Sequence, residues 1–154
     1  MCIRDRANSK YQVDVVKAEL EAMGITATLF SFSDSNDLAA VVEAAVAESD
    51  VIYVPTDNTA AANAGIIDNI CQPAGIPVIT GEEGPCAICG VATLSISYYD
   101  LGYTTGQMAA KILKGEAKVG EMPVEYAPVT KKYNKTICDA LGITPPSDDY
   151  VAIG

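Results

Sequence analysis

Apolar and polar residues alternate along the chain in a pattern that predicts a succession of helices and strands. Residues 9–23 and 38–46 place apolar side chains at helical spacing, and Ser9 with Gln12 forms a possible capping box at the first of these helices. Short runs rich in β-branched and aromatic residues predict strands at residues 25–32, 51–54, 76–79 and 91–96. Helices that alternate with strands indicate an α/β fold in which a parallel sheet is flanked by helices.

Two further helices are predicted from small-residue and apolar stripes, at residues 60–71 and 101–113. In the second helix Gly102 and Gly106 lie four apart and would allow close approach to a neighbouring element. One face of this helix carries Leu101, Thr105, Met108, Ala109 and Ile112. The remaining expectations are an edge strand at residues 123–128, a short helix from a cap at Asn134 to residue 141, and an irregular tail from residue 145.

Polar corners follow three of the predicted strands, at residues 55–59, 81–90 and 97–100. Asp57 or Asn58 is expected to cap the helix after the first corner, and Asp100 is expected to cap the helix after the third. The carboxyl ends of parallel strands lie at one edge of a sheet, where small ligands bind in open α/β folds. The three corners should therefore gather along one rim and outline half a cleft.

An amino-acid zwitterion suits such a half-cleft. The amides at the helix start and Thr59 would hold its carboxylate, and Glu83 or Asp57 would hold its ammonium group. The ring of Tyr98 or Tyr99 would stack on an aromatic side chain. Each of these residues also has a simpler explanation, as a helix cap, a solvated acidic loop or a packed tyrosine, and the residues alone leave both explanations open.

Composition favours binding over catalysis. The 154 residues are 49% hydrophobic and 19% charged, which is typical of a soluble globular domain, and no apolar run approaches the ~18 residues that cross a membrane. Twenty acidic against ten basic residues give a net charge of -10, which would repel nucleic acid. The chain has no histidine, the commonest metal ligand and general base, so a zinc enzyme or hydrolase is disfavoured. We expect no cofactor, no metal and no enzymatic activity.

The five cysteines include one C-x-x-C motif, formed by Cys86 and Cys89. Such a motif at a helix start can lower the pKa of one thiol and support disulfide exchange, so a thiol oxidoreductase is an alternative function. The motif follows a late strand, however, and lacks the flanking aromatic residue of thioredoxin-type sites. A zinc site would need two further ligands that the sequence does not supply.

Residues 1–6, M-C-I-R-D-R, show neither periodicity nor a cap and resemble a translated sequencing-adapter remnant. We therefore leave them out of the fold prediction. On this expectation Cys2 is not native, the chain is a fragment without its true amino terminus, and the lack of a signal peptide says nothing about export. The strand that normally precedes the first helix of a doubly wound sheet is then missing as well.

Four runs in order resemble the substrate-binding proteins of ABC transporters of the tryptophan/tyrosine type: Y-V-P-T-D-N-T from Tyr53, I-P-V-I-T-G-E-E-G from Ile76, A-T-L-S-I-S-Y-Y-D-L-G from Ala92 and A-A-K-I-L-K-G-E-A from Ala109. The resemblance covers about residues 7–154. It implies one lobe, the carboxyl-terminal half, of a type I periplasmic-binding fold. Such a protein is secreted, lipid-anchored and non-enzymatic, closes on an aromatic amino acid or similar small solute, and delivers it to an ABC permease.

The resemblance also implies a division of the chain and a set of ligand-facing positions. Residues 7–96 would form the carboxyl-terminal lobe, residues 97–117 a hinge and a helix that packs on the missing amino-terminal lobe, and residues 118–154 the return to the first lobe. The positions that match ligand-facing ones are Asp57, Asn58, Thr59, Glu83, Gly84 and Tyr98. The family usually lacks paired cysteines, so residues 85–89 depart from its pattern. A ligand-sensing domain of a lactose-repressor-type regulator has the same fold and is a further alternative.

Overall fold

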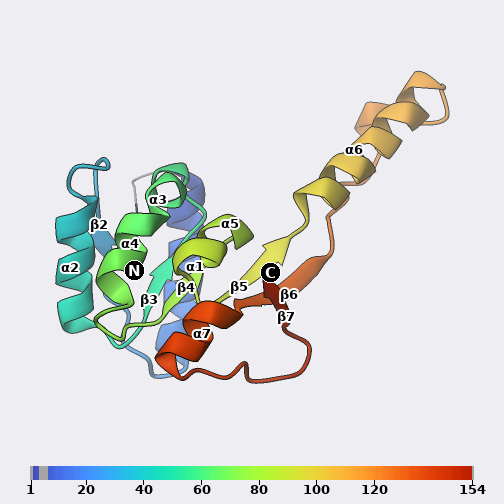
Figure 1. Ribbon diagram of the computed structural model, residues 1–154. Helices are drawn as coiled ribbons and strands as arrows, with labels where there is room; N and C mark the ends of the chain where they lie inside the picture. The colour runs from blue at the N-terminus through green and yellow to red at the C-terminus, as the bar shows by residue number, and fades with distance from the viewer. Residues whose placement is uncertain (1, 4–6, 154) are drawn as a thin grey trace.

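The computed structural model describes residues 2–3 and 7–153, and its main feature is a five-stranded sheet in the order β3-β4-β5-β6-β7 (Figure 1). The strands are β3 (Ile52–Val54), β4 (Val78–Thr80), β5 (Ala92–Ile96), β6 (Val129–Asn134) and β7 (Val151–Ile153). The first three are parallel, as the sequence predicts, whereas β6 runs antiparallel to β5, and β7 is parallel to β6. The predicted α/β class is confirmed, with one antiparallel pair in a mostly parallel sheet.

A separate two-stranded pair joins β1 (Cys2–Ile3) to β2 (Phe30–Ser31) in parallel. The strand expected at residues 25–32 is therefore much shorter, because residues 25–29 have no ladder partner. Ladder hydrogen bonds are made by main-chain groups, so a two-residue pairing at the amino end does not depend on the side chains there. The non-native origin of residues 1–6 stays a prediction, and residues 1 and 4–6 lie outside the described residues.

The described helices are α1 (Ala7–Ala22), α2 (Leu38–Glu48), α3 (Asn58–Ala62), α4 (Ala64–Cys71), α5 (Glu83–Cys89), α6 (Tyr98–Leu113), the 3-10 turn η1 (Val119–Glu121) and α7 (Lys135–Leu141). The helix expected at residues 60–71 is divided at Asn63, which caps both halves. The corner expected at residues 81–90 contains α5, which a sequence pattern of Gly, Glu and Pro did not indicate. The caps at Asn134 and Gly142 are confirmed, the latter at φ 68°.

Opposite faces of β3 pack against different helices. Ile52 and Val54 point into the main core, which is formed with apolar residues of α2 and α4 such as Val42 and Ile67. Tyr53 points the other way and packs with Val13 and with Val16 of α1. Alternate residues of a strand face opposite sides of the sheet, so this three-residue strand joins two layers of helices.

Helix α6 projects away from the sheet on an arm made of residues 97–128, and none of its residues is buried (Figure 1). The arm leaves the sheet after β5 and returns into β6, and the two strands are paired up to Ile96 and Val129. The edge strand predicted at residues 123–128 is wrong, because the strand begins only at Val129. Pro123 and Pro128 lack the N–H that a ladder needs. The tail after Pro145 is also not wholly irregular, since it ends in β7.

Candidate functional site

The ends of β3, β4 and β5 meet along one rim of the sheet, as the sequence predicts. Gly81 at the end of β4 donates its N–H to the carbonyl of Val54 at 2.8 Å, and the Thr56 hydroxyl donates back to the Gly81 carbonyl at 3.3 Å. A Cβ on Gly81 would lie only 2.8 Å from the Thr56 nitrogen. The first two corners are therefore in direct contact, and glycine is needed where they touch.

Asp57 is the N-cap of α3, as predicted, and its carboxylate is fully occupied. Its Oδ1 accepts the N–H groups of Thr59 at 2.8 Å and Ala60 at 3.0 Å, and the residue is only 2% exposed. The expectation that unpaired helix-start amides face a ligand anion is wrong for these two amides, because the cap satisfies them. Asp57 shapes the first corner from below the surface.

Ser9 and Gln12 do not form the predicted capping box. Helix α1 begins two residues earlier, at Ala7, so Ser9 lies within the helix and both side chains project toward the first corner. The Thr56 N–H donates to Gln12 Oε1 at 2.8 Å, and the buried Ser9 hydroxyl lies 3.1 Å from the Thr56 carbonyl. The sequence analysis did not predict these contacts of Ser9 and Gln12 with the first corner. Two polar side chains three residues apart on an otherwise apolar helix face could have indicated them.

Asn58 and Thr59 are the residues of this corner that reach the surface. Asn58 is exposed as the first residue of α3, and Thr59 is half-buried beside it. Their side chains are placed at the carboxyl end of β3, on the rim that the three strands share. Contact with a solute remains a prediction for both residues.

The second corner separates two adjacent glutamates. Glu83, the first residue of α5, forms an ion pair with Lys132 of β6 at 2.6 Å, and their side chains are 40% and 24% exposed. Glu82 instead faces the third corner, where the Tyr98 hydroxyl donates to its Oε2 at 3.3 Å. Gly84 is exposed, with nothing within 4 Å of an added Cβ. The sequence predicts Glu83 or Asp57 as the carboxylate that holds the ammonium group, and in the structure the charge of Glu83 is compensated by Lys132.

Tyr98 opens α6 at the third corner, with its side chain largely exposed. Partial desolvation of the hydroxyl and the neighbouring charge of Glu82 raise the pKa of Tyr98, so the hydroxyl stays protonated at neutral pH and can donate. The predicted cap at Asp100 is wrong: Ser97 is the N-cap, and its hydroxyl accepts the Asp100 N–H at 3.1 Å. Tyr99 stacks on Tyr103 along α6, with ring centroids 6.5 Å apart.

The C-x-x-C cysteines lie inside the domain. Cys71, Cys86, Cys89 and Cys138 are all buried. Burial raises the pKa of Cys86 to about 11 and that of Cys89 to about 12, which is opposite to the shift that activates a redox thiol. Within residues 2–3 and 7–153 no group of His, Cys, Asp or Glu side chains is arranged to hold a metal ion.

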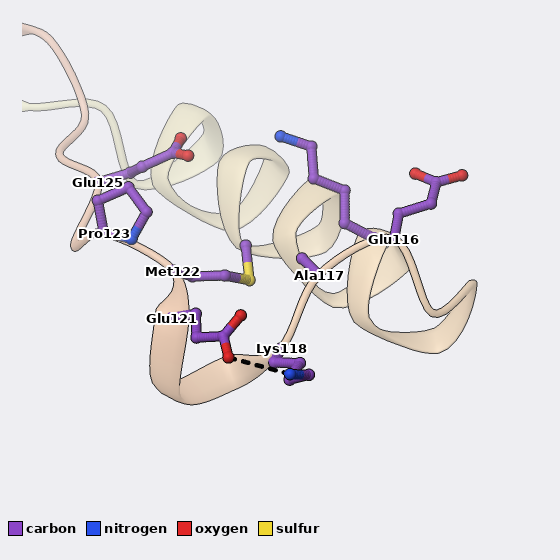
Figure 2. A pocket seen from close by; sticks show the side chains of 8 residues that line it. Glu116, Ala117, Lys118, Glu121, Met122, Pro123 and Glu125 are labelled. Carbon is purple, nitrogen blue, oxygen red and sulfur yellow. Dashed lines mark hydrogen bonds and ion pairs between the residues drawn. The ribbon is translucent and has the colours of Figure 1, made fainter.

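Two hollows in the surface lie away from this rim. One of about 380 Å³ sits at the far end of the arm, between α6 and η1, where Lys118 pairs with Glu121 at 3.0 Å and Met122 points toward the helix (Figure 2). The other, of about 480 Å³, lies beside α1 and is lined in part by Val16, Tyr53 and Ile79. Neither includes any of the six candidate residues.

Polar corners at the carboxyl ends of parallel strands, together with an arm that leaves and re-enters the sheet, define one lobe of a type I periplasmic-binding fold. Residues 1–150 match the family described as ABC transporter substrate binding protein, and the chain belongs to this family. The family is non-enzymatic and its members are extracytoplasmic. In the described part of the chain, no helix combines the length and apolar character that a membrane crossing requires.

Relatives support this assignment. A tyrosine-binding protein of Clostridioides difficile (strain R20291) is 32% identical over 117 residues, which are 76% of this chain and 34% of the relative. A ligand-free, open structure of a Clostridium difficile substrate binding protein with adhesive properties is 35% identical, with a TM-score of 0.78 over 99% of this chain and 53% of that one. A structure from Streptococcus pneumonia in complex with L-Trp is 30% identical, with a TM-score of 0.84 over 99% and 56%. The chain thus spans about half the length of these solved structures.

Proposed function

We propose that this chain is the ligand-gripping half of a solute-binding component of an ABC importer, and that the solute is an aromatic amino acid. The observation that carries the proposal is the hydrogen-bonded contact between corners on three neighbouring strands, which brings Asn58, Glu82 and Tyr98 to one rim. This rim combines polar groups for a zwitterion with an exposed aromatic ring. The tyrosine-binding relative and the L-Trp complex support the same solute class.

Within this proposal the six residues have different roles. Asn58, Thr59 and Tyr98 contact the solute, with Tyr98 stacking on its ring. Asp57 sets the shape of the first corner through its cap, and Gly84 leaves space at the start of α5. Glu83 contributes to the electrostatic environment through its pair with Lys132. Together they form one wall of a cleft whose other wall is a second lobe.

Helix α6 supplies the link to that second lobe. It has no buried residue in this chain, and an added Cβ at Gly102 or Gly106 would meet nothing within 4 Å. We infer that the glycine side of α6 packs closely on the second lobe, so that residues 97–117 belong to that lobe in space. An exposed helix face of this kind otherwise favours association.

The remaining expectations follow from the importer role. ABC permease subunits would be the macromolecular partners, and the protein would work outside the cytoplasmic membrane, held there by a lipid anchor. No described feature favours the regulator or the thiol oxidoreductase. Reading the DNA around the gene separates the importer component from the regulator. A second lobe with a lipoprotein signal supports the importer, and a helix-turn-helix segment supports a regulator.

The direct test is calorimetric titration of the product of the complete reading frame with L-tryptophan, L-tyrosine and L-phenylalanine. Saturable heat with at least one of them is expected. The absence of heat with all three would remove the aromatic assignment. Insulin reduction by the same preparation would revive the oxidoreductase, and none is expected because the thiols are buried.

A further inference from the structure

Two adjacent carboxylates at the end of β4 have opposite electrostatic surroundings. Glu83 has its cation in place, since Lys132 Nζ lies 2.6 Å from its Oε2. Glu82 belongs to none of the ion pairs between residues 7 and 153. Its described partner is a neutral group, the Tyr98 hydroxyl, at 3.3 Å. Of the two, Glu82 is the carboxylate that has no positively charged partner among residues 7–153.

The position of Glu82 places it where a solute would arrive. It lies two residues after the end of β4 as the N-cap of α5, between the corner that carries Asn58 and the first residue of α6. Its backbone is anchored, because the Thr80 hydroxyl donates to the Glu82 carbonyl at 2.9 Å and so fixes the start of the corner. Its side chain is half-buried and directed toward Tyr98, which is 62% exposed.

We propose that Glu82, and not Glu83, binds the ammonium group of the solute, and that this ammonium takes the place of the Tyr98 hydroxyl on the Glu82 carboxylate. This inference rests on the proposed function and specifies its substrate class further: the solute must carry a free α-ammonium group. The Tyr98–Glu82 hydrogen bond is then the resting contact of the empty site.

The exchange is favourable because an ammonium is a stronger partner for a carboxylate than a phenol is. The hydrogen bond from Tyr98 is already charge-assisted, because its acceptor is a carboxylate. An ammonium keeps such a hydrogen bond and adds the attraction between opposite charges, which a neutral phenol lacks. An ammonium offers three donors and no acceptor, so it can satisfy Glu82 and still bind a second acceptor on the rim. Tyr98 loses one long hydrogen bond and its ring becomes free to turn toward the solute.

The exchange also removes a hydrogen bond that holds the arm, residues 97–128, to the sheet. Tyr98 is the first residue of α6, and its hydroxyl ties the start of the arm to the end of β4. When the ammonium releases that hydroxyl, the tie is lost at the point where the chain crosses toward the second lobe. Binding of the charged group would thereby ease the movement of the arm relative to the sheet.

The test compares matched variants one residue apart in the complete protein: Glu82→Gln, Glu83→Gln and Tyr98→Phe. Affinities are measured by calorimetry for L-tryptophan and L-tyrosine and for their deaminated analogues, 3-indolepropionate and 3-(4-hydroxyphenyl)propionate. Glu82→Gln should weaken binding of the amino acids about 10- to 100-fold, as expected for loss of a charged hydrogen-bond partner. It should also lose most of the wild-type preference for the amino acid over the deaminated analogue.

Glu83→Gln is the matched control for Glu82→Gln. It removes one negative charge at the adjacent position and should change the affinity for the amino acids by less than about fivefold. Tyr98→Phe is a further test and not a control, because Tyr98 contacts the solute. It keeps the ring and removes the competing hydroxyl, so the amino acids should bind more tightly than to the wild type, and weaker binding would contradict the exchange. Unchanged far-UV circular dichroism and melting temperature show that each variant is folded.

The outcomes separate the two levels of inference. If the wild type binds an aromatic amino acid but Glu82→Gln binds it equally well, or if Glu83→Gln is the variant that loses it, the role of Glu82 is overturned. An undiminished preference for the amino acid in Glu82→Gln overturns it as well. If the wild type binds none of the amino acids, the proposed function itself fails.

Discussion

The hydroxyl of Ser9 and the carboxylate of Asp57 lie 3.3 Å apart and are buried, although 48 positions separate them in the sequence. Through this contact helix α1, on one face of the sheet, supports the cap of α3 at the candidate site. The same hydroxyl also approaches the Thr56 carbonyl. The first corner is therefore held by a helix that contributes no ligand-facing residue of its own.

Replacement of Asp57 by alanine should destabilise the domain by about 2–3 kcal/mol, because the cap of α3 is lost and the Ser9 hydroxyl loses a buried partner. Urea unfolding followed by circular dichroism measures the change. Asp57→Asn retains a cap acceptor and should cost much less. Asn58→Ala, on the exposed neighbour, should stay within about 0.5 kcal/mol. Equal losses in Asp57→Ala and Asn58→Ala would contradict the assigned role.

Glycine at position 81 is required by contact, whereas glycine at position 84 is not. A Cβ on Gly81 would meet Thr56 main chain at 2.8 Å, so Gly81→Ala should cost about 1–3 kcal/mol of stability by pushing the first two corners apart. Gly84 has open space and lies in α5, so Gly84→Ala should stabilise by about 0.5–1 kcal/mol. Thermal unfolding of the two variants should shift in opposite directions. Shifts of the same sign would refute the contact argument.

Alanine at Gly102 and Gly106 should have opposite effects in two contexts. In the 154-residue chain both positions are open, so the double variant should raise helix propensity by about 1 kcal/mol per site and slow hydrogen exchange of the α6 amides. In the complete protein the same variant should lower the melting temperature if α6 packs on a second lobe through these glycines. Stabilisation in both contexts would show that the glycine side faces solvent.

The four buried cysteines, Cys71, Cys86, Cys89 and Cys138, should resist alkylation in the native state. With pKa values raised to about 11 and 12, Cys86 and Cys89 hold well under ~1% thiolate at pH 7.5, and burial also excludes the reagent. In a Cys2→Ser variant, iodoacetamide should label the protein at least about 100-fold more slowly than after unfolding in urea. Rapid modification of Cys86 in the folded protein, located by mass spectrometry, would disprove the buried position.

Asp37 should make stability depend on acid pH. Its carboxylate accepts the N–H groups of Ser33 and Asp34, and these bonds hold its pKa below the ordinary value of 3.8. A lowered folded-state pKa stabilises the protein above the unfolded value, and that stabilisation is lost as the pH falls through the folded value. Asp37→Ala should therefore reduce the urea midpoint at pH 7 and have a smaller effect at pH 3. An effect that is constant or grows toward low pH would exclude this role.

Local signals in the sequence were sufficient to predict most strands of the sheet and the rim where the polar corners meet. The β-branched run before Pro55 and the cap at Asp57 predicted β3 and the start of α3, because both depend on residues close together in the chain. The alternation of strands and helices then placed the three corners on one edge without any coordinates. The same reasoning placed Asn134 and Gly142 at the ends of α7.

Long-range partners decided the features that sequence reasoning missed. Whether Ser9 caps its own helix or contacts a residue 48 positions away depends on where α1 docks, and no local pattern carries that information. Glu82 and Glu83 are equivalent by sequence, and only the neighbouring strand β6 assigns Lys132 to one of them. Prolines are common at the ends of edge strands, so the prolines that bound residues 123–128 predict a return strand there, whereas β6 begins only at Val129.

The paired strands β5 and β6 also determine how the arm can move. Its outgoing and returning connections start from Ile96 and Val129, which are neighbours in one antiparallel ladder, so both ends of the arm are attached to the sheet at one place. We expect a body packed on the far end of the arm to pivot about this common attachment. The pivot lies at the start of α6, so the motion would change the distance between that body and the rim with Asn58, Glu82 and Tyr98.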